Sequence, residues 1–209
     1  MGGILMHIDR RQIWQGLITG VVATGSLPLK TAAQQTAPST FALSNGLRTH
    51  VQANDSGYVA AKLVLRSAAI TSSGLAHLFE HTSCVGAAGS WTADEVSNKY
   101  RDCIQDGNAS TEPGTLTWDA TFLPQHLPNV IELLAAITLD QHFDVATVEA
   151  QSRVVLEELY VDNHDAVKKA QKHFNRQLFG GSHPYSKETT GQEIAWTKQS
   201  TSRKIKKLQ

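Results

Sequence analysis

Two histidines four residues apart, with a glutamate between them, constrain this sequence more than any other feature. The segment Gly-Leu-Ala-His-Leu-Phe-Glu-His occupies residues 74–81, so His77, Glu80 and His81 form an H-x-x-E-H pattern. Residues three and four apart lie on one face of an α-helix, so a common role for these side chains requires a helix. We therefore expect a helix over residues 74–85.

The same three residues have the chemistry of a catalytic zinc site. Two imidazoles suit zinc, and a third protein ligand with an open position for water completes such a site. By its position Glu80 is placed to take a proton from that water and pass it to a leaving amine. Two histidines at this spacing also arise by chance, so the alternative of packed or solvated histidines stays open at this point.

Hydrophobic alternation predicts that the first elements after residue 40 are strands. Asn45-Gly46 lies between two alternating runs, which is the strongest short-range signal for a β-hairpin. Alternating β-branched, aromatic and polar residues predict a second strand pair, formed by segments 59–66 and 116–123.

Helical periodicity takes over later in the chain. Thr92 and Glu95 fit a capping box, which predicts a helix that begins after Thr92. The expected helices are 92–103, 127–139 and, with two interruptions, 147 to about 178. Strands followed by helices, a further strand and long helices indicate an α+β fold, in which helices are layered on an antiparallel β-sheet.

The composition narrows the class of partner. The chain has 209 residues, of which 41% are hydrophobic and 18% charged, an ordinary composition for one globular domain. Between positions 34 and 193 there are 11 basic and 18 acidic residues, so nucleic acid is not expected as a ligand. Cys84 and Cys103 are too few for a disulfide framework, and the sequence does not decide whether they pair.

The two ends of the sequence differ from its body. Residues 1–33 carry Arg10-Arg11 and then an apolar run shorter than the roughly 20 residues that a membrane span needs. This layout predicts an export signal, and the arginine pair favours the twin-arginine route to the periplasm or exterior of a bacterium. The alternative is an amphipathic helix packed on the domain. Residues 34–40 are expected to form a linker, and 197–209 a solvated basic tail.

Five segments, taken in order, resemble the insulinase/pitrilysin family of zinc metallopeptidases. H-x-x-E-H is the inverted zinc motif of the inverzincins. The matching segments are S-N-G-L-R at 44–48, G-L-A-H-L-F-E-H at 74–81, D-G-N-A-S-T at 106–111, R-V-V-L-E-E-L at 153–159, and S-H-P-Y at 182–185 with Gly191. The resemblance covers residues 41–196. It implies one insulinase-like half-domain, a zinc-dependent endopeptidase that hydrolyses peptides or unfolded proteins.

The resemblance also implies roles for individual residues. His77 and His81 would be zinc ligands, and Glu80 would be the catalytic carboxylate. The family takes its third ligand from a glutamate on a separate helix, which corresponds here to Glu158. Its neighbour Glu157 is the residue that a one-position shift selects, and only one of the two can face the metal because adjacent helical residues point about 100° apart.

A strand beside the zinc is the family's substrate-binding element. An extended peptide adds to the edge of this strand through backbone hydrogen bonds. By resemblance, Asn108 would orient the substrate carbonyl, and Ala109 would keep the edge open because it is small.

The sequence departs from the family pattern in three places. Gln151 stands where the family usually has a glutamate, and the link at 67–73 is shorter than is typical. Family members pair such a domain with a homologous second one, so the resemblance implies a missing C-terminal domain or a homologous partner subunit. Two alternatives remain, a non-catalytic scaffold or peptide-binding subunit of a heterodimer and a truncated inactive fragment. The intact H-x-x-E-H pattern argues against the scaffold.

Overall fold

The computed structural model describes residues 37–66 and 74–191. Several expected segments lie outside the described residues: the export signal at 1–33, the first part of the linker at 34–36, the link at 67–73, the end of the domain at 192–196 and the basic tail at 197–209. Within the described ranges, no helix has the length and apolar character needed to cross a membrane.

A three-stranded antiparallel sheet forms the platform of the fold. Strands β3 (Val59–Arg66), β6 (Thr115–Phe122) and β5 (Asp106–Glu112) lie side by side in that order. The pairing of β3 with β6 confirms the strand pair expected from the sequence. Because β6 is central, β5 is an edge strand of this sheet among the described residues.

The two faces of the sheet differ in polarity. Alternate residues of β6 are buried, namely Leu116, Trp118, Ala120 and Phe122. The opposite face is polar, and it carries an ion pair of 3.0 Å between Lys62 Nζ and Asp119 Oδ1. This alternation means that one face of the sheet is covered by other elements.

The predicted hairpin is confirmed as a separate two-stranded sheet. Strand β1 (Ser39–Ala42) pairs with β2 (Arg48–Val51) across the turn that contains Asn45 and Gly46. The Leu47 N–H donates to Asn45 Oδ1 at 3.0 Å, a local bond that explains the preference for asparagine here. Strand β1 begins at Ser39, inside the segment expected to be a linker.

Three helices begin and end within one residue of their expected positions: α2 at Leu75–Val85, α3 at Ala93–Cys103 and α4 at Leu127–Leu139. The capping box of α3 is present, because Thr92 Oγ1 accepts from the Glu95 N–H and Glu95 Oε2 accepts from the Thr92 N–H. Helix α4 has Pro128 in its first turn, where a missing N–H costs nothing.

The long helical region at the end of the described chain is two helices. Helix α5 (Val145–His164) is followed by α6 (Ala166–Phe179) after a single residue, Asp165. The Asp165 side chain accepts from two backbone N–H groups of α6 and so starts the new helix. The remaining short elements are β4 (Ala87–Ala88), which pairs with β7 (Gln141–His142), and the 3-10 turns η1 (Pro124–His126) and η2 (Pro184–Ser186).

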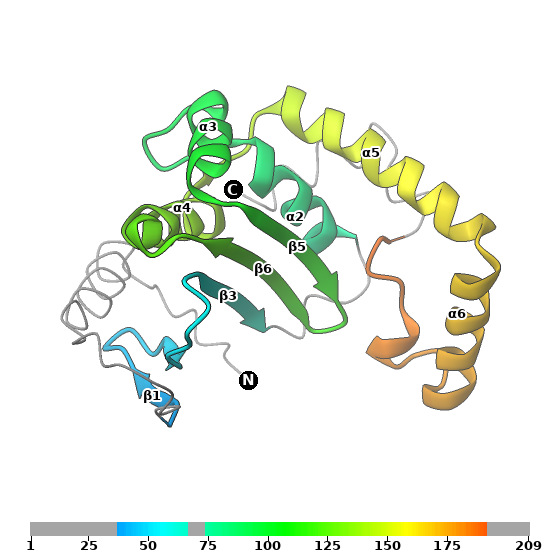
Figure 1. The fold of residues 1–209 in the computed structure, drawn as a ribbon. Coiled ribbons are helices and arrows are strands. Elements are labelled where there is room, and N and C mark those ends of the chain that lie inside the picture. Colours follow the sequence, from blue (N-terminus) through cyan, green and yellow to red (C-terminus); the bar gives the residue numbers. More distant parts are fainter. Residues whose placement is uncertain (1–36, 67–73, 192–209) are drawn as a thin grey trace, which may run out of the picture.

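Helices α2, α3 and α4 gather on one side of the sheet, and α5 runs past α2 with α6 beyond it (Figure 1). The main core lies between the sheet and these helices. It contains Ala88, Val96, Ile104, Leu116, Trp118, Ala120, Phe122, Val130, Leu133, Leu134, Ala136 and Ile137. A second cluster joins α2 to α5 and contains Leu78, Val148, Val155 and Leu159. The structure therefore confirms the α+β class, with helices layered on an antiparallel sheet.

Helix α2 is fixed to the sheet by one buried hydrogen bond. The indole Nε1–H of Trp118 on β6 donates to Ser83 Oγ at 3.0 Å, and Ser83 is fully buried. The Ser83 hydroxyl in turn donates to the Glu80 carbonyl at 2.7 Å. These bonds determine how the face of α2 that carries the histidines is oriented toward the edge strand.

Replacing Ser83 by alanine is expected to destabilise the metal-free protein by about 1–3 kcal/mol, because a buried indole N–H is left without an acceptor. Urea unfolding with linear extrapolation measures the loss. The matched control is Ser152→Ala, since the Ser152 hydroxyl is also buried but donates only to the Val148 carbonyl of its own helix. An equal loss in both variants would contradict the role given to the Trp118 contact.

Candidate metal centre

A left-handed glycine starts the helix that carries the histidines. Gly74 has a φ of 67°, a conformation that costs glycine little because it has no Cβ. Its carbonyl accepts from the Leu78 N–H at 2.9 Å, which begins the hydrogen-bond ladder of α2. The four-residue spacing then puts His77 and His81 on one face, with ring centroids 4.7 Å apart and planes at 83°. Their Nε2 atoms face each other at 3.1 Å.

Glu158 on α5 completes a three-atom cluster with these nitrogens. Its Oε2 lies 3.4 Å from Nε2 of His77 and 3.4 Å from Nε2 of His81. The side chain of Glu157, by contrast, is exposed. The structure thus brings together Glu158 and not its neighbour with the two histidines.

The spacing of the three atoms fits a tetrahedral ion. Zinc bonds to nitrogen and carboxylate oxygen are about 2.0–2.2 Å, so two ligand atoms of a tetrahedral zinc are about 3.3–3.5 Å apart. The distances in the cluster are 3.1, 3.4 and 3.4 Å. Two imidazoles and one carboxylate are also the donor set of several catalytic zinc sites. The side chains present therefore fit a zinc ion.

Burial and charge prepare His77 for metal binding. Burial first, and then the nearby His81, lower the pKa of His77 from 6.5 to about 4, while the Asp162 carboxylate opposes the shift. A neutral imidazole at neutral pH has a free lone pair, which a metal ligand needs. His77 Nδ1 is buried and has no hydrogen-bond partner among the described residues.

The cluster is open on the side of helix α5. The Glu158 side chain is 44% exposed, against 12% for His77 and 16% for His81.

Glu80 is held by a side chain from the sheet. Thr111 Oγ1 on β5 donates to Glu80 Oε2 at 2.5 Å, the length of a charge-assisted bond. Burial raises the pKa of Glu80 above its usual value, and the Thr111 hydrogen bond opposes that rise. A raised carboxyl pKa suits a group that exchanges protons near neutral pH.

Sequence reasoning did not assign a role to Thr111. The residue ends segment 106–111, in which the family resemblance implies functions for Asn108 and Ala109 alone. Strand alternation puts Thr111 on the same face as Ala109, and the register pairs them with Leu116 and Trp118, which are buried. That face is covered by the helices, so alternation was the available signal that Thr111 lies under α2.

Asn108 and Ala109 lie on β5 but do not join the cluster. Asn108 is exposed and pairs with Asp119, so it lies on the sheet face opposite to Thr111. Ala109 is partly buried and packs against the main core. Gly107, directly before Asn108, lies close to helix α3. A Cβ added to Gly107 would lie 2.1 Å from Tyr100 Oη, which explains why a glycine is found at this position.

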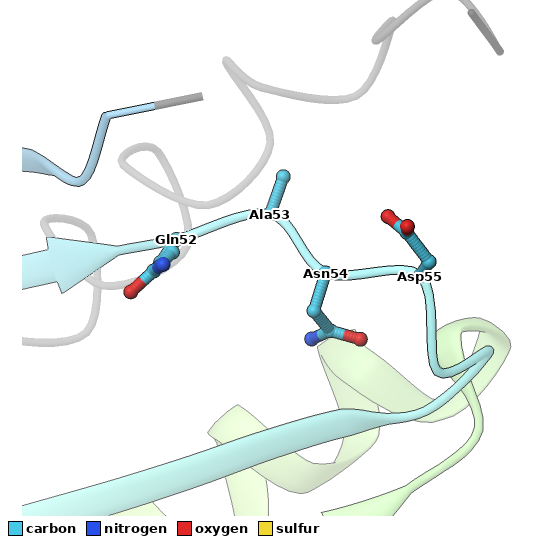
Figure 2. Close-up of a pocket in the computed structure, with 4 residues that line it drawn as sticks. All are labelled: Gln52, Ala53, Asn54 and Asp55. Atoms are coloured by element: carbon cyan, nitrogen blue, oxygen red, sulfur yellow. The ribbon is translucent and has the colours of Figure 1, made fainter. Parts of the chain in front are cut away.

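The other reactive side chains lie outside the cluster. Cys84 and Cys103 are both free thiols packed against the main core, and burial raises the pKa of Cys84. A surface hollow lies beside residues 52–55 between β2 and β3, with side chains that alternate to either side of the extended chain (Figure 2). They do not converge on one point, so the hollow contributes nothing to the candidate centre.

An H-x-x-E-H helix on an antiparallel sheet, beside a second helix that presents a glutamate, defines a peptidase-type domain. The family model described as Insulinase (Peptidase family M16) matches residues 66–191. The chain belongs to this family, which confirms the resemblance drawn from the sequence. No curated protein matches the sequence.

Solved proteases share the fold. A protease from Helicobacter pylori has a TM-score of 0.70 and 18% identity, over 84% of this chain and 43% of that chain. The periplasmic protease PqqL from Escherichia coli has a TM-score of 0.71 and 19% identity, over 85% of this chain and 21% of that chain. The first half of PqqL, solved separately, has a TM-score of 0.70 and 19% identity, over 85% of this chain and 40% of that chain. The chain thus spans less than half the length of each of these proteins.

Proposed function

We propose that this chain is a zinc-dependent endopeptidase domain, in which His77, His81 and Glu158 hold the metal. The observation that carries the proposal is the convergence of three donor atoms, Nε2 of each histidine and Oε2 of Glu158, at 3.1, 3.4 and 3.4 Å from one another. The donor set and its spacing match a zinc site with three protein ligands.

Glu80 is the proton carrier in this proposal. Zinc, when bound, supplies Lewis-acid chemistry that acidifies water and polarises a carbonyl. The Glu80 carboxylate takes a proton from water as the water oxygen bonds to the peptide carbonyl carbon. It then gives that proton to the amide nitrogen as the C–N bond breaks, so it ends the cycle unchanged. Burial, which raises the pKa of Glu80, favours the protonated form that the second step needs.

The edge strand β5 is the proposed substrate-binding element. Within the described part of the chain, β5 pairs with β6 on one side and with no strand on the other. An extended peptide can add to such an edge through backbone hydrogen bonds. Asn108 is exposed on this strand and is proposed to orient the substrate backbone, while the small Ala109 leaves the edge accessible. The substrate class is extended peptide, from peptides or unfolded proteins.

A homologous domain or partner subunit is proposed to complete the active protein. The matched proteases are longer, and this chain corresponds to 43% and 21% of two of them. We also propose that the protein is periplasmic or secreted, because residues 1–33 have the layout of an export signal. One matched protease, PqqL, is described as periplasmic.

Native mass spectrometry of the chain with one equivalent of zinc tests the metal centre. One zinc per chain is expected. A folded chain that binds no zinc would overturn the proposed function and favour a non-catalytic, peptide-binding role.

A further inference from the structure

Two carboxylates lie close enough to the histidines to serve as the third metal ligand. Ligand atoms of His77, Glu80 and His81 all lie within 4.8 Å of one another. Glu158 Oε2 lies 3.4 Å from each histidine Nε2. A zinc site with both carboxylates bound would have no carboxylate free to carry a proton. Something in the fold must therefore decide which glutamate binds the ion.

The hydroxyl of Thr111 is the feature that distinguishes the two carboxylates. It donates to Glu80 Oε2 at 2.5 Å, a bond across 31 residues of sequence. Charge-assisted hydrogen bonds of this length are the stronger ones in proteins. Glu158 Oε2, in contrast, lies 3.4 Å from both histidine nitrogens, so this carboxylate is directed at the centre.

The position of Thr111 is itself rigidly determined. As a β-branched residue it has few χ1 rotamers, and its partner across the strands, Leu116, is buried in the core. The facing helix is fixed to the same sheet through the bond between Ser83 and Trp118. A hydroxyl held this way keeps its acceptor in one place rather than following it.

We propose that Thr111 is a positioning residue that keeps Glu80 out of the metal ligand set, so that Glu158 is the third ligand and Glu80 stays free to carry the proton. This inference rests on the proposed function. It assigns to the edge strand a second task, since the strand proposed to bind the peptide also orients the proton carrier on α2.

The inference predicts that Thr111 and Glu158 are coupled in zinc affinity. Glu158→Gln removes the third ligand and weakens zinc binding. Thr111→Val keeps the shape but removes the donor, so Glu80 is released and can replace the lost ligand. The double variant is therefore expected to bind zinc at least about tenfold more tightly than Glu158→Gln alone, because a hydrogen bond to a charged group is worth about that factor.

The experiment is competition for zinc between the protein and a chromophoric chelator, with the wild type, both single variants and the double variant. Thr111→Ser combined with Glu158→Gln should bind as weakly as Glu158→Gln, because serine restores the donor. The matched control is Ser110→Ala, which removes the neighbouring hydroxyl of β5, one that pairs with Thr117 Oγ1 at 2.7 Å and not with Glu80. Combined with Glu158→Gln, it should give no recovery.

The outcomes separate the inference from the function on which it rests. The inference alone is overturned if Glu158→Gln weakens zinc binding as expected but the double variant binds zinc no more tightly than Glu158→Gln. Recovery by Ser110→Ala as well as by Thr111→Val also overturns it, because the effect would then come from strand β5 in general. A wild type that binds no zinc overturns the proposed function and the inference together. Circular dichroism verifies that each variant is folded, and Thr111→Ala replaces Thr111→Val if the valine variant is not.

Discussion

Replacing Glu80 by glutamine is expected to abolish peptide hydrolysis while the protein keeps its zinc. Glutamine has nearly the same shape, and its amide oxygen can still accept from the Thr111 hydroxyl that holds Glu80 in place. An amide does not take up the proton of water at neutral pH, so the proton transfer is lost. General acid–base catalysis contributes about 10²–10⁴-fold, and the rate should fall by that factor or more.

Two measurements on the same preparation test this expectation. Cleavage of a fluorogenic, unstructured peptide reports the rate, and native mass spectrometry reports zinc per chain. The assay uses the longest natural form of the protein that hydrolyses the peptide, with its partner present if one is needed. Glu157→Gln is the matched control, because Glu157 is an exposed glutamate for which the structure gives no contact with the centre. An active Glu80→Gln variant would refute the assigned role, and a variant without zinc would make Glu80 a ligand.

The parts of the fold that the sequence predicted are those with local causes. The Thr92 and Glu95 capping box, Pro128 at the start of α4 and the Asn45-Gly46 turn each act within a few residues. Such signals do not depend on the rest of the chain, and the helices they predict begin within one residue of the expected positions. The pairing of β3 with β6 was also predicted, because both strands alternate in the same way.

The parts that sequence reasoning left out depend on contacts between distant segments. The two-residue strands β4 and β7 pair across 53 residues or more of sequence and have no periodicity of their own. The break between α5 and α6 was expected only as an interruption, and it is located by the side chain of Asp165. Thr111 is the clearest case, since its bond to Glu80 exists only after β5 and α2 have packed together.

The candidate site also combines a part that local sequence predicts with a part that depends on contacts between distant segments. Helical spacing alone predicts that His77 and His81 share a face, and the structure agrees. No local rule relates them to Glu158, because α5 and α2 are brought together by tertiary packing, in which Leu78 lies against the apolar face of α5. The choice of Glu158 over Glu157 came from the family resemblance, and the structure places Glu158 at the histidines by the phase of that helix.

The largest effect on metal binding is expected from the three ligands themselves. Removing a side chain that hydrogen-bonds to a metal ligand typically weakens metal affinity by about 10–100-fold. Removing the ligand itself should weaken the affinity at least as much. His77→Ala, His81→Ala and Glu158→Gln should each therefore weaken zinc binding by more than about 100-fold. In all three variants the Thr111 hydroxyl still holds Glu80, so Glu80 is not expected to replace the lost ligand.

The adjacent glutamate Glu157 on α5 provides a matched control for the Glu158 variant. Glu158→Gln and Glu157→Gln remove the same charge from neighbouring positions of one helix, so they change net charge and helix propensity equally. Only Glu158 has an oxygen 3.4 Å from both histidines. Competition with a zinc chelator should therefore separate the two variants by the full cost of a ligand. Equal affinities in the two would mean that a metal at the histidines takes its third ligand elsewhere. A loss confined to Glu157→Gln would mean that α5 is rotated by one residue relative to the arrangement described.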